Sequence, residues 1–252
     1  FDEIYELKPN QLQLGFLKVL KGSYMFEHAA EYGIVYHDKP PYEVMSTKWL
    51  SFDDVIKIKR VEDMLEVYYN SGQFEITMKL MECIFDSAFE FFQELGDFYE
   101  ANGYFGMSHS RIRRCEILLE FLALYLHGCD NDAMTSVVLS ENAGDRDNTD
   151  FDENEQIYNM IQESLIFDLY YRENCKSRPR WATDIGKFKH MTHAYCKNGK
   201  LSHVEPFHYI FPDKHTRKLD ELPKYHKEPV WALFHYDMRD PLDHQALVEY
   251  IK

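Results

Sequence analysis

The spacing of apolar residues changes close to residue 175, and this change sets the class of fold that the chain can adopt. Before it, from about residue 51, apolar residues recur every three or four positions, which is the spacing of amphipathic helices. After it they alternate, as on the two faces of a strand, and Asn198-Gly199 separates two alternating runs. The sequence therefore predicts an α+β protein, mainly α, in which a helical bundle is followed by a small antiparallel sheet.

Capping residues mark where the predicted helices begin. Ser51, with Asp54 three residues later, forms a capping-box start. Ser108 or Ser110 begins a later helix that is apolar nearly all round, so we expect that helix at the centre of the bundle. The predicted helices are 51–70, 74–82 continuing or kinking into 83–101, 110–127 and 153–174, and the predicted strands are 190–196, 201–211, 230–238 and 246–251.

The run QLQLGFLKVLKGS at residues 11–23 predicts a buried strand that stops at the turn Gly22-Ser23. A buried strand needs neighbours for its backbone groups and cover for its faces, and residues 1–10 are too few to supply them. Either later strands complete the sheet, with YEVMSTKWL at 42–50 as a candidate, or the chain begins partway through a larger fold.

Composition excludes several functional classes. The formal net charge of −15 repels phosphate backbones, so we expect no nucleic-acid partner. The five cysteines form no C-x-x-C pair, and the most apolar stretch, residues 117–126, is too short to span a membrane. We therefore expect a cytoplasmic protein with no membrane partner. Residues 128–152 are acidic and lack a helical period, which predicts a solvated loop.

The segment that follows the last predicted helix contains the candidate site. Its cations lie near a helix C-terminus, where they complement the helix dipole. The alternative is that they clamp an anionic substrate or dock a neighbouring domain. Both interpretations stay open, and no catalytic residue is predicted. The candidate residues are Arg172, Lys176, Arg178, Arg180 and Trp181.

The C-terminal part of the chain is rich in histidine, with eight of the twelve between residues 190 and 244. His190 and His193 are three apart, and His203 and His208 are five apart, so each pair would point to opposite faces of a strand. Zinc would also need cysteine or carboxylate partners in fixed geometry. We therefore predict no metal site, and a stand-alone metal hydrolase is the least favoured hypothesis.

Four stretches of the sequence resemble one known region. They are QLQLGFLKVLKGSYM, EYGIVYHDKPPYEVMSTKWLSFDDVIKIKRVEDMLEVYYNSGQF, LYYRENCKSRPRW and LFHYDMRDPLDHQA. They are similar to the C-terminal region of B12-binding-type radical SAM proteins, often named by similarity to the anaerobic magnesium-protoporphyrin IX monomethyl ester oxidative cyclase. The resemblance covers nearly the whole chain, is most specific over residues 11–73, and points to a domain without known chemistry.

The resemblance implies a longer polypeptide with a cobalamin-binding α/β domain, a radical SAM partial barrel and then this region. The barrel would bind a [4Fe–4S] cluster through a C-x-x-x-C-x-x-C motif, and the cluster's open iron would bind S-adenosylmethionine. This sequence lacks that motif, so no cluster ligand carries over and no cofactor is expected in this chain. Residues 1–50 would be a C-terminal remnant of the radical SAM α/β barrel, 51–175 a helical domain and 176–252 a small antiparallel β subdomain.

The hypothesis that follows is a C-terminal accessory domain that covers the barrel and shapes the substrate site, without catalysis of its own. Its partners would be the N-terminal radical SAM and B12-binding-type domains of the same polypeptide. The alternative is a self-contained helical module that binds a partner protein. A fully paired sheet formed by residues 11–20 and 42–50 would weaken the first hypothesis.

Overall fold

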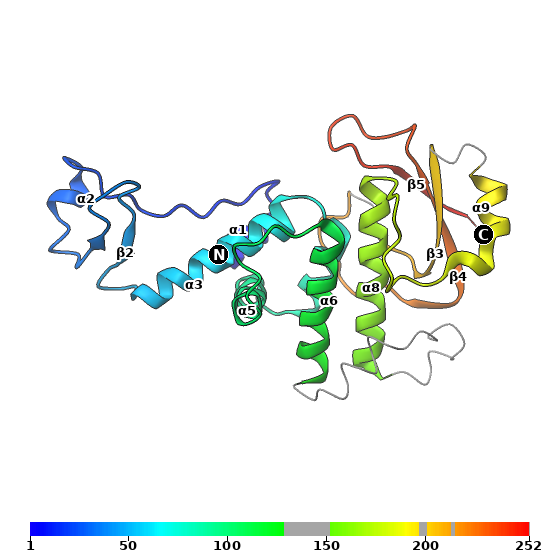
Figure 1. The fold of residues 1–252 in the computed structure, drawn as a ribbon, viewed down its shortest axis with the longest axis horizontal. Coiled ribbons are helices and arrows are strands. Elements are labelled where there is room, and N and C mark those ends of the chain that lie inside the picture. Colours follow the sequence, from blue (N-terminus) through cyan, green and yellow to red (C-terminus); the bar gives the residue numbers. More distant parts are fainter. Residues whose placement is uncertain (129–151, 197–200, 213–214, 252) are drawn as a thin grey trace. The chain divides into compact units, whose positions relative to one another are not determined.

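The computed structural model describes residues 1–128, 152–196, 201–212 and 215–251 (Figure 1). These residues confirm the α+β, mainly α, class, with a two-stranded and a three-stranded antiparallel sheet. Most of the acidic loop predicted at residues 128–152, namely residues 129–151, and the Asn198-Gly199 turn lie outside the described residues.

The chain forms two compact units that alternate along the sequence. The first unit contains residues 1–71 and 85–106, and the second contains residues 72–84 and 107–252. The predicted domains, divided at residues 50 and 175, follow the sequence order and stay a prediction.

The first unit is built on two packed helices, α3 (Phe52–Met64) and α5 (Ala88–Ala101). A π-helix, η1 (Leu65–Asn70), continues α3. Gly96 of α5 permits the close approach, because a Cβ atom at that position would lie 3.0 Å from the Cβ of Arg60. Arg60 Nη1 donates a 2.9 Å hydrogen bond to Asp97 Oδ1 across the same contact. The buried side chains between the helices include Val61, Met64, Tyr68, Phe92 and Leu95.

The predicted continuation of residues 74–82 into 83–101 is resolved into two separate helices. Ser87 ends the continuity, because its Oγ accepts a 3.1 Å hydrogen bond from the backbone N–H of Glu90 and so caps α5. Asp2, in the short helix α1 (Asp2–Tyr5), accepts a second bond from the backbone N–H of Phe89 at 2.9 Å. The preceding helix, α4 (Glu75–Ile84), belongs to the second unit.

The prediction of a buried strand at residues 11–23 is wrong. Residues 11–20 contain a single bridge, between Lys18 and Glu43, and among their apolar side chains Val19 alone is buried. The segment is held instead by Asn70, whose side chain accepts from the Leu12 backbone N–H and donates to the Leu12 carbonyl, each at 2.9 Å. The other apolar side chains of the run are half-buried or exposed within this unit.

Short elements complete the N-terminal part of the first unit. They are α2 (Tyr24–Glu27) and a small antiparallel pair, β1 (Val35–Tyr36) and β2 (Val44–Ser46). The predicted strand at 42–50 is thus present but shorter.

The second unit is organised around α8 (Glu153–Arg172), which packs against α4, α6 (Arg111–His127) and the three-stranded sheet (Figure 1). The sequence pattern had placed α6 at the centre, whereas α8 contacts all of these elements. Ser110 caps α6 as one of the two predicted alternatives, with a 3.1 Å bond from the Arg113 N–H to its Oγ. The ring of Phe167 on α8 contacts three rings of the C-terminal part, those of Phe207, Phe211 and Phe234.

The sheet has the order β3 (Ser202–Tyr209), β4 (Tyr225–His235) and β5 (Leu247–Ile251). Both pairs are antiparallel, as predicted, with Leu233 opposite Val204 and Glu249. The prediction of a strand at 190–196 is wrong, because that segment forms helix α9 (Lys189–Tyr195) after the 3₁₀ turn η4 (Ile185–Phe188). Seven residues are too few for period alone to separate a strand from a helix.

Ser51 provides a direct test of the capping analysis. Its side chain accepts from the Asp54 N–H at 3.1 Å while Asp54 accepts from the Ser51 N–H at 2.9 Å. Ser51→Ala should lower the free energy of unfolding by about 1 kcal/mol, and Ser51→Gly by only a few tenths, because glycine is tolerated at this position. Urea denaturation followed by circular dichroism measures both values, and equal losses in the two variants would contradict the capping role.

Candidate functional site at the C-terminal end of α8

A buried carboxylate on α8 caps the beginning of α4. Asp168 is 3% exposed, and its Oδ1 accepts a hydrogen bond from the Ile76 N–H at 3.0 Å. Its Oδ2 accepts from the Thr77 N–H at 2.9 Å and from the Thr77 hydroxyl at 2.7 Å. The first N–H groups of a helix have no partner within the helix, so Asp168 satisfies donors that would otherwise be buried and unpaired.

Burial determines the protonation behaviour of this carboxylate. Desolvation raises the pKa of Asp168 to about 6, and the hydrogen bonds from Ile76 and Thr77 and the charge of Arg111 offset only part of that rise. At neutral pH the group is therefore charged, in the form that accepts the bonds from α4.

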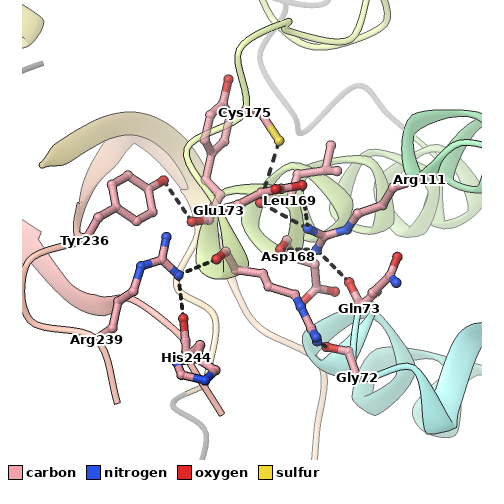
Figure 2. Close-up of polar contacts among 12 residues, drawn as sticks. Gly72, Gln73, Arg111, Asp168, Leu169, Glu173, Cys175, Tyr236, Arg239 and His244 are labelled. Atoms are coloured by element: carbon pink, nitrogen blue, oxygen red, sulfur yellow. Dashed lines mark hydrogen bonds and ion pairs between the residues drawn. The ribbon is translucent and has the colours of Figure 1, made fainter. Parts of the chain in front are cut away.

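Arg111, the first residue of α6, connects the same two helices through their backbones (Figure 2). Its Nη2 donates to the carbonyl of Gln73 at 2.9 Å and to the carbonyl of Asp168. Its Nη1 lies 3.4 Å from the carbonyl of Leu169 and 3.7 Å from the Glu173 carboxylate. The guanidinium thus joins the chain just before α4 to the last turns of α8.

The remaining carbonyls at the end of α8 accept hydrogen bonds from the region between β4 and β5 (Figure 2). The hydroxyl of Tyr236 donates to the Tyr170 carbonyl at 2.9 Å, and the N–H of Ala246 donates to the Tyr171 carbonyl at 2.8 Å. Arg239 Nη1 donates to the carbonyl of Arg172. Carbonyls in the last turn of a helix lack partners within the helix and carry its negative partial charge, so cationic and hydroxyl donors suit this position.

The predicted cationic segment is divided between several environments. Arg172 donates to the carbonyl of Gly72 at 3.1 Å, and Arg178 pairs with Glu205 and bonds the carbonyl of Thr183. Lys176 and Arg180 are exposed. The carbonyl of Trp181 accepts a 2.9 Å bond from Gln162. Whether these residues also bind a substrate or another domain stays a prediction.

Arg178 belongs to a second buried charge cluster, which the sequence analysis did not identify. Glu205 of β3 is 1% exposed, and its Oε1 accepts from both Arg178 and His203 Nε2, the latter at 2.6 Å. The His203 ring stacks on Tyr170 of α8, with centroids 3.8 Å apart. His203 and Glu205 are two residues apart on one strand, so their side chains point to the same face of the sheet. This spacing is the sequence signal that could have indicated the pair.

A third polar contact joins α8 to β3. Glu163 accepts from the backbone N–H of His208 at 2.8 Å and lies 2.8 Å from His208 Nδ1. Burial raises the pKa of Glu163, and the hydrogen bond to Glu163 raises the pKa of His208. Each of these three carboxylates joins two segments of the unit. Asp168 joins α8 to α4, Glu163 joins α8 to β3, and Glu205 joins β3 to the segment after α8.

The described residues contain no group of three or more histidine, cysteine, aspartate or glutamate side chains that could hold a metal ion. No helix in the described part of the chain is long and apolar enough to cross a membrane.

Comparison with known proteins identifies the family of the chain. A family profile described as a protein of unknown function, DUF4080, matches residues 30–246. The chain belongs to the DUF4080 family. The search of curated proteins gave no match, and neither did the search of solved structures. The DUF4080 match includes α4, α6, α8, β3 and β4, so the capping geometry around α8 lies within the region that defines the family match.

Asp168→Ala tests the cap of α4. The substitution leaves buried N–H groups of Ile76 and Thr77 without an acceptor, so we expect the free energy of unfolding to fall by about 3 kcal/mol. Glu173→Ala at the same end of α8 is the matched control, because that side chain is 63% exposed and should change stability by less than about 0.5 kcal/mol. Urea denaturation of both variants measures the difference, and equal small effects would show that the cap is not important.

The raised pKa of Asp168 predicts a pH dependence of stability. Between about pH 4, where an unfolded aspartate titrates, and about pH 6, the folded protein binds more protons than the unfolded chain. The contribution of Asp168 is therefore fully present below about pH 4 and is lost as pH rises through about 6. Asp168→Asn does not titrate, so the stability of the wild type relative to this variant should fall by roughly 2 to 3 kcal/mol from pH 4 to 7. Urea denaturation across this range measures it, and a relative stability that rises with pH would contradict the assignment.

Proposed function

We propose that this DUF4080 chain is the C-terminal accessory domain of a radical SAM enzyme and has no catalytic activity of its own. It would cover the mouth of the radical SAM barrel, exclude water from radical intermediates and help to shape the substrate site. The resemblance of four stretches over nearly the whole chain supports this context. The compartment would be the cytoplasm, and the partners would be the N-terminal domains of the same polypeptide.

The observation that carries the non-catalytic role is the use of the charged side chains. Asp168 accepts hydrogen bonds from backbone N–H groups of α4, while Arg111 and Arg239 donate to backbone carbonyls of α8. A catalytic group must be within reach of a substrate proton or reacting atom, whereas these groups are bonded to the chain's own backbone. Their arrangement supports a scaffold that holds helices and a sheet in place.

The N-terminal segment gives further support. Residues 11–20 and 42–50 do not form a fully paired sheet, because the backbone bonds between them join Val19 N–H to the Tyr42 carbonyl and Val44 N–H to the Leu17 carbonyl, around the single bridge of Lys18 with Glu43. Incomplete pairing favours a segment that is completed by another domain over a self-contained module.

The cofactors of such an enzyme would belong to the preceding domains. A [4Fe–4S] cluster would be held there by a C-x-x-x-C-x-x-C motif, with S-adenosylmethionine bound to the cluster and cobalamin in the first domain. The cysteines of this chain do not form that motif, so its residues would contribute to covering the site and to the substrate environment.

Anaerobic reconstitution with iron and sulfide tests the proposal. The 252-residue chain should neither form a stoichiometric [4Fe–4S] cluster nor cleave S-adenosylmethionine, whereas the polypeptide extended toward its N-terminus should do both. The extended polypeptide with its cluster cysteines changed to alanine is the control and should lose both properties. Cleavage of S-adenosylmethionine by the 252-residue chain alone would overturn the proposal, and so would an extended polypeptide without a cluster.

A further inference from the structure

The N-terminal lobe, which we define as residues 11–52, has almost no core of its own. Among its hydrophobic residues only Val19 and Val44 are buried. Six large apolar side chains are each more than 40% exposed, namely Leu20, Tyr24, Val35, Trp49, Leu50 and Phe52. Contiguous apolar surface on a protein commonly marks a place where another molecule binds.

Four rings of the lobe form a continuous cluster, which we call the aromatic face: Tyr24, His28, Tyr32 and Trp49. Tyr24 stacks on His28 with centroids 3.9 Å apart, and Tyr32 lies 5.9 Å from Trp49. The hydroxyls of Tyr24 and Tyr32 are 3.2 Å apart, which ties the two halves of the cluster together. Trp49 is 68% exposed and Tyr24 is 58% exposed, so large ring surfaces remain open to a partner.

Lys48 adds a cation to the aromatic face. Its Nζ lies 4.3 Å from the centroid of the Trp49 ring and 5.2 Å from that of Tyr32. Within the described residues no carboxylate pairs with this ammonium group. Rings that flank a cation are typical of the central contacts in protein interfaces, where tyrosine and tryptophan are enriched.

The charge of the lobe differs from that of the rest of the chain. Its four lysines (Lys18, Lys21, Lys39 and Lys48) balance its four acids (Glu27, Glu31, Asp38 and Glu43), so the formal charge of −15 comes entirely from residues outside it. A neutral apolar surface can approach another protein without the repulsion that the remaining surface would cause. Glu27 and Glu31 follow Tyr24 closely in sequence, which makes a phosphate-rich ligand less suitable.

We propose that the aromatic face docks on the domain that precedes this chain in the same polypeptide, at an apolar surface with a carboxylate opposite Lys48. This choice of partner rests on the proposed function. A second copy of the chain is a poorer partner, because such a dimer would also bring together the residues outside the two lobes, which carry the formal charge of −15 on each copy. Trp49 is the anchor of the interface, since it is the most exposed ring of the face and contacts both Lys48 and Tyr32.

Photo-cross-linking in the extended polypeptide tests this proposal. The photoreactive residue p-benzoylphenylalanine replaces Trp49 in one sample and, as a matched control, Leu242 in another, because Leu242 is 91% exposed and lies in the second unit. After irradiation and peptide mapping, position 49 should link to a segment upstream of Phe1 in the same molecule. The yield of that link should be at least tenfold above the yield from position 242 to the same segment.

The remaining outcomes overturn the docking proposal. They are links from position 49 only to a second copy, only to nucleic acid or another protein, or no upstream link above the control. Assaying S-adenosylmethionine cleavage on the same samples separates the two proposals. Cleavage without the upstream link refutes the docking surface alone, whereas the upstream link in a polypeptide without cluster or cleavage refutes the radical SAM function and leaves the docking surface standing.

Discussion

The cap that Asp168 provides to α4 holds together a unit whose parts are far apart in the sequence. Residues 72–84 belong to the second unit although the chain on both sides of them belongs to the first. Asp168 reaches Ile76 and Thr77 across more than ninety residues, and Arg111 reaches the carbonyl of Gln73 from α6. These polar contacts act together with the burial of Ile76 and Thr77 to fix the beginning of α4 in the second unit.

At the C-terminal end of α8, polar side chains likewise satisfy backbone groups, and here they donate hydrogen bonds to the helix carbonyls. Donors from α6 and from the region between β4 and β5 bond to its last carbonyls, so one helix terminus is joined to both the bundle and the sheet. An unpaired buried carbonyl costs free energy comparable to a lost hydrogen bond, which makes this terminus sensitive to the position of each partner. Arg111 and Arg239 therefore hold neighbouring elements against the end of α8 through hydrogen bonds, in addition to complementing the helix dipole with their charge.

Much of the fold was predictable because its signals are local. The capping box at Ser51, the cap at Ser110 and the helix ending near residue 172 depend on residues within a few positions of each other. The role of Asp168 was not predictable, since its partners lie on another helix, although an acid within the apolar run LIFDLYY was a visible anomaly. The cationic residues near the end of α8 allow two interpretations from sequence, the helix dipole or a binding role, and the bond from Arg172 to the carbonyl of Gly72 depends on a segment a hundred residues away that the sequence pattern does not indicate.

The failure at residues 11–23 has a physical cause that differs from the failure at 190–196. In the second case a short alternating segment was compatible with both a helix and a strand. In the first, the apolar residues predict a segment that tends to be buried. The sequence does not indicate whether the burying residues belong to the same unit or to a neighbouring molecule or domain. Residues 11–20 are held by contacts such as Asn70 with Leu12 and Val19 with Tyr42, and these contacts bury Val19 but leave Leu17 and Leu20 exposed. A backbone ordered by hydrogen bonds and a surface rich in exposed rings fit a segment whose hydrophobic burial is completed by a neighbour.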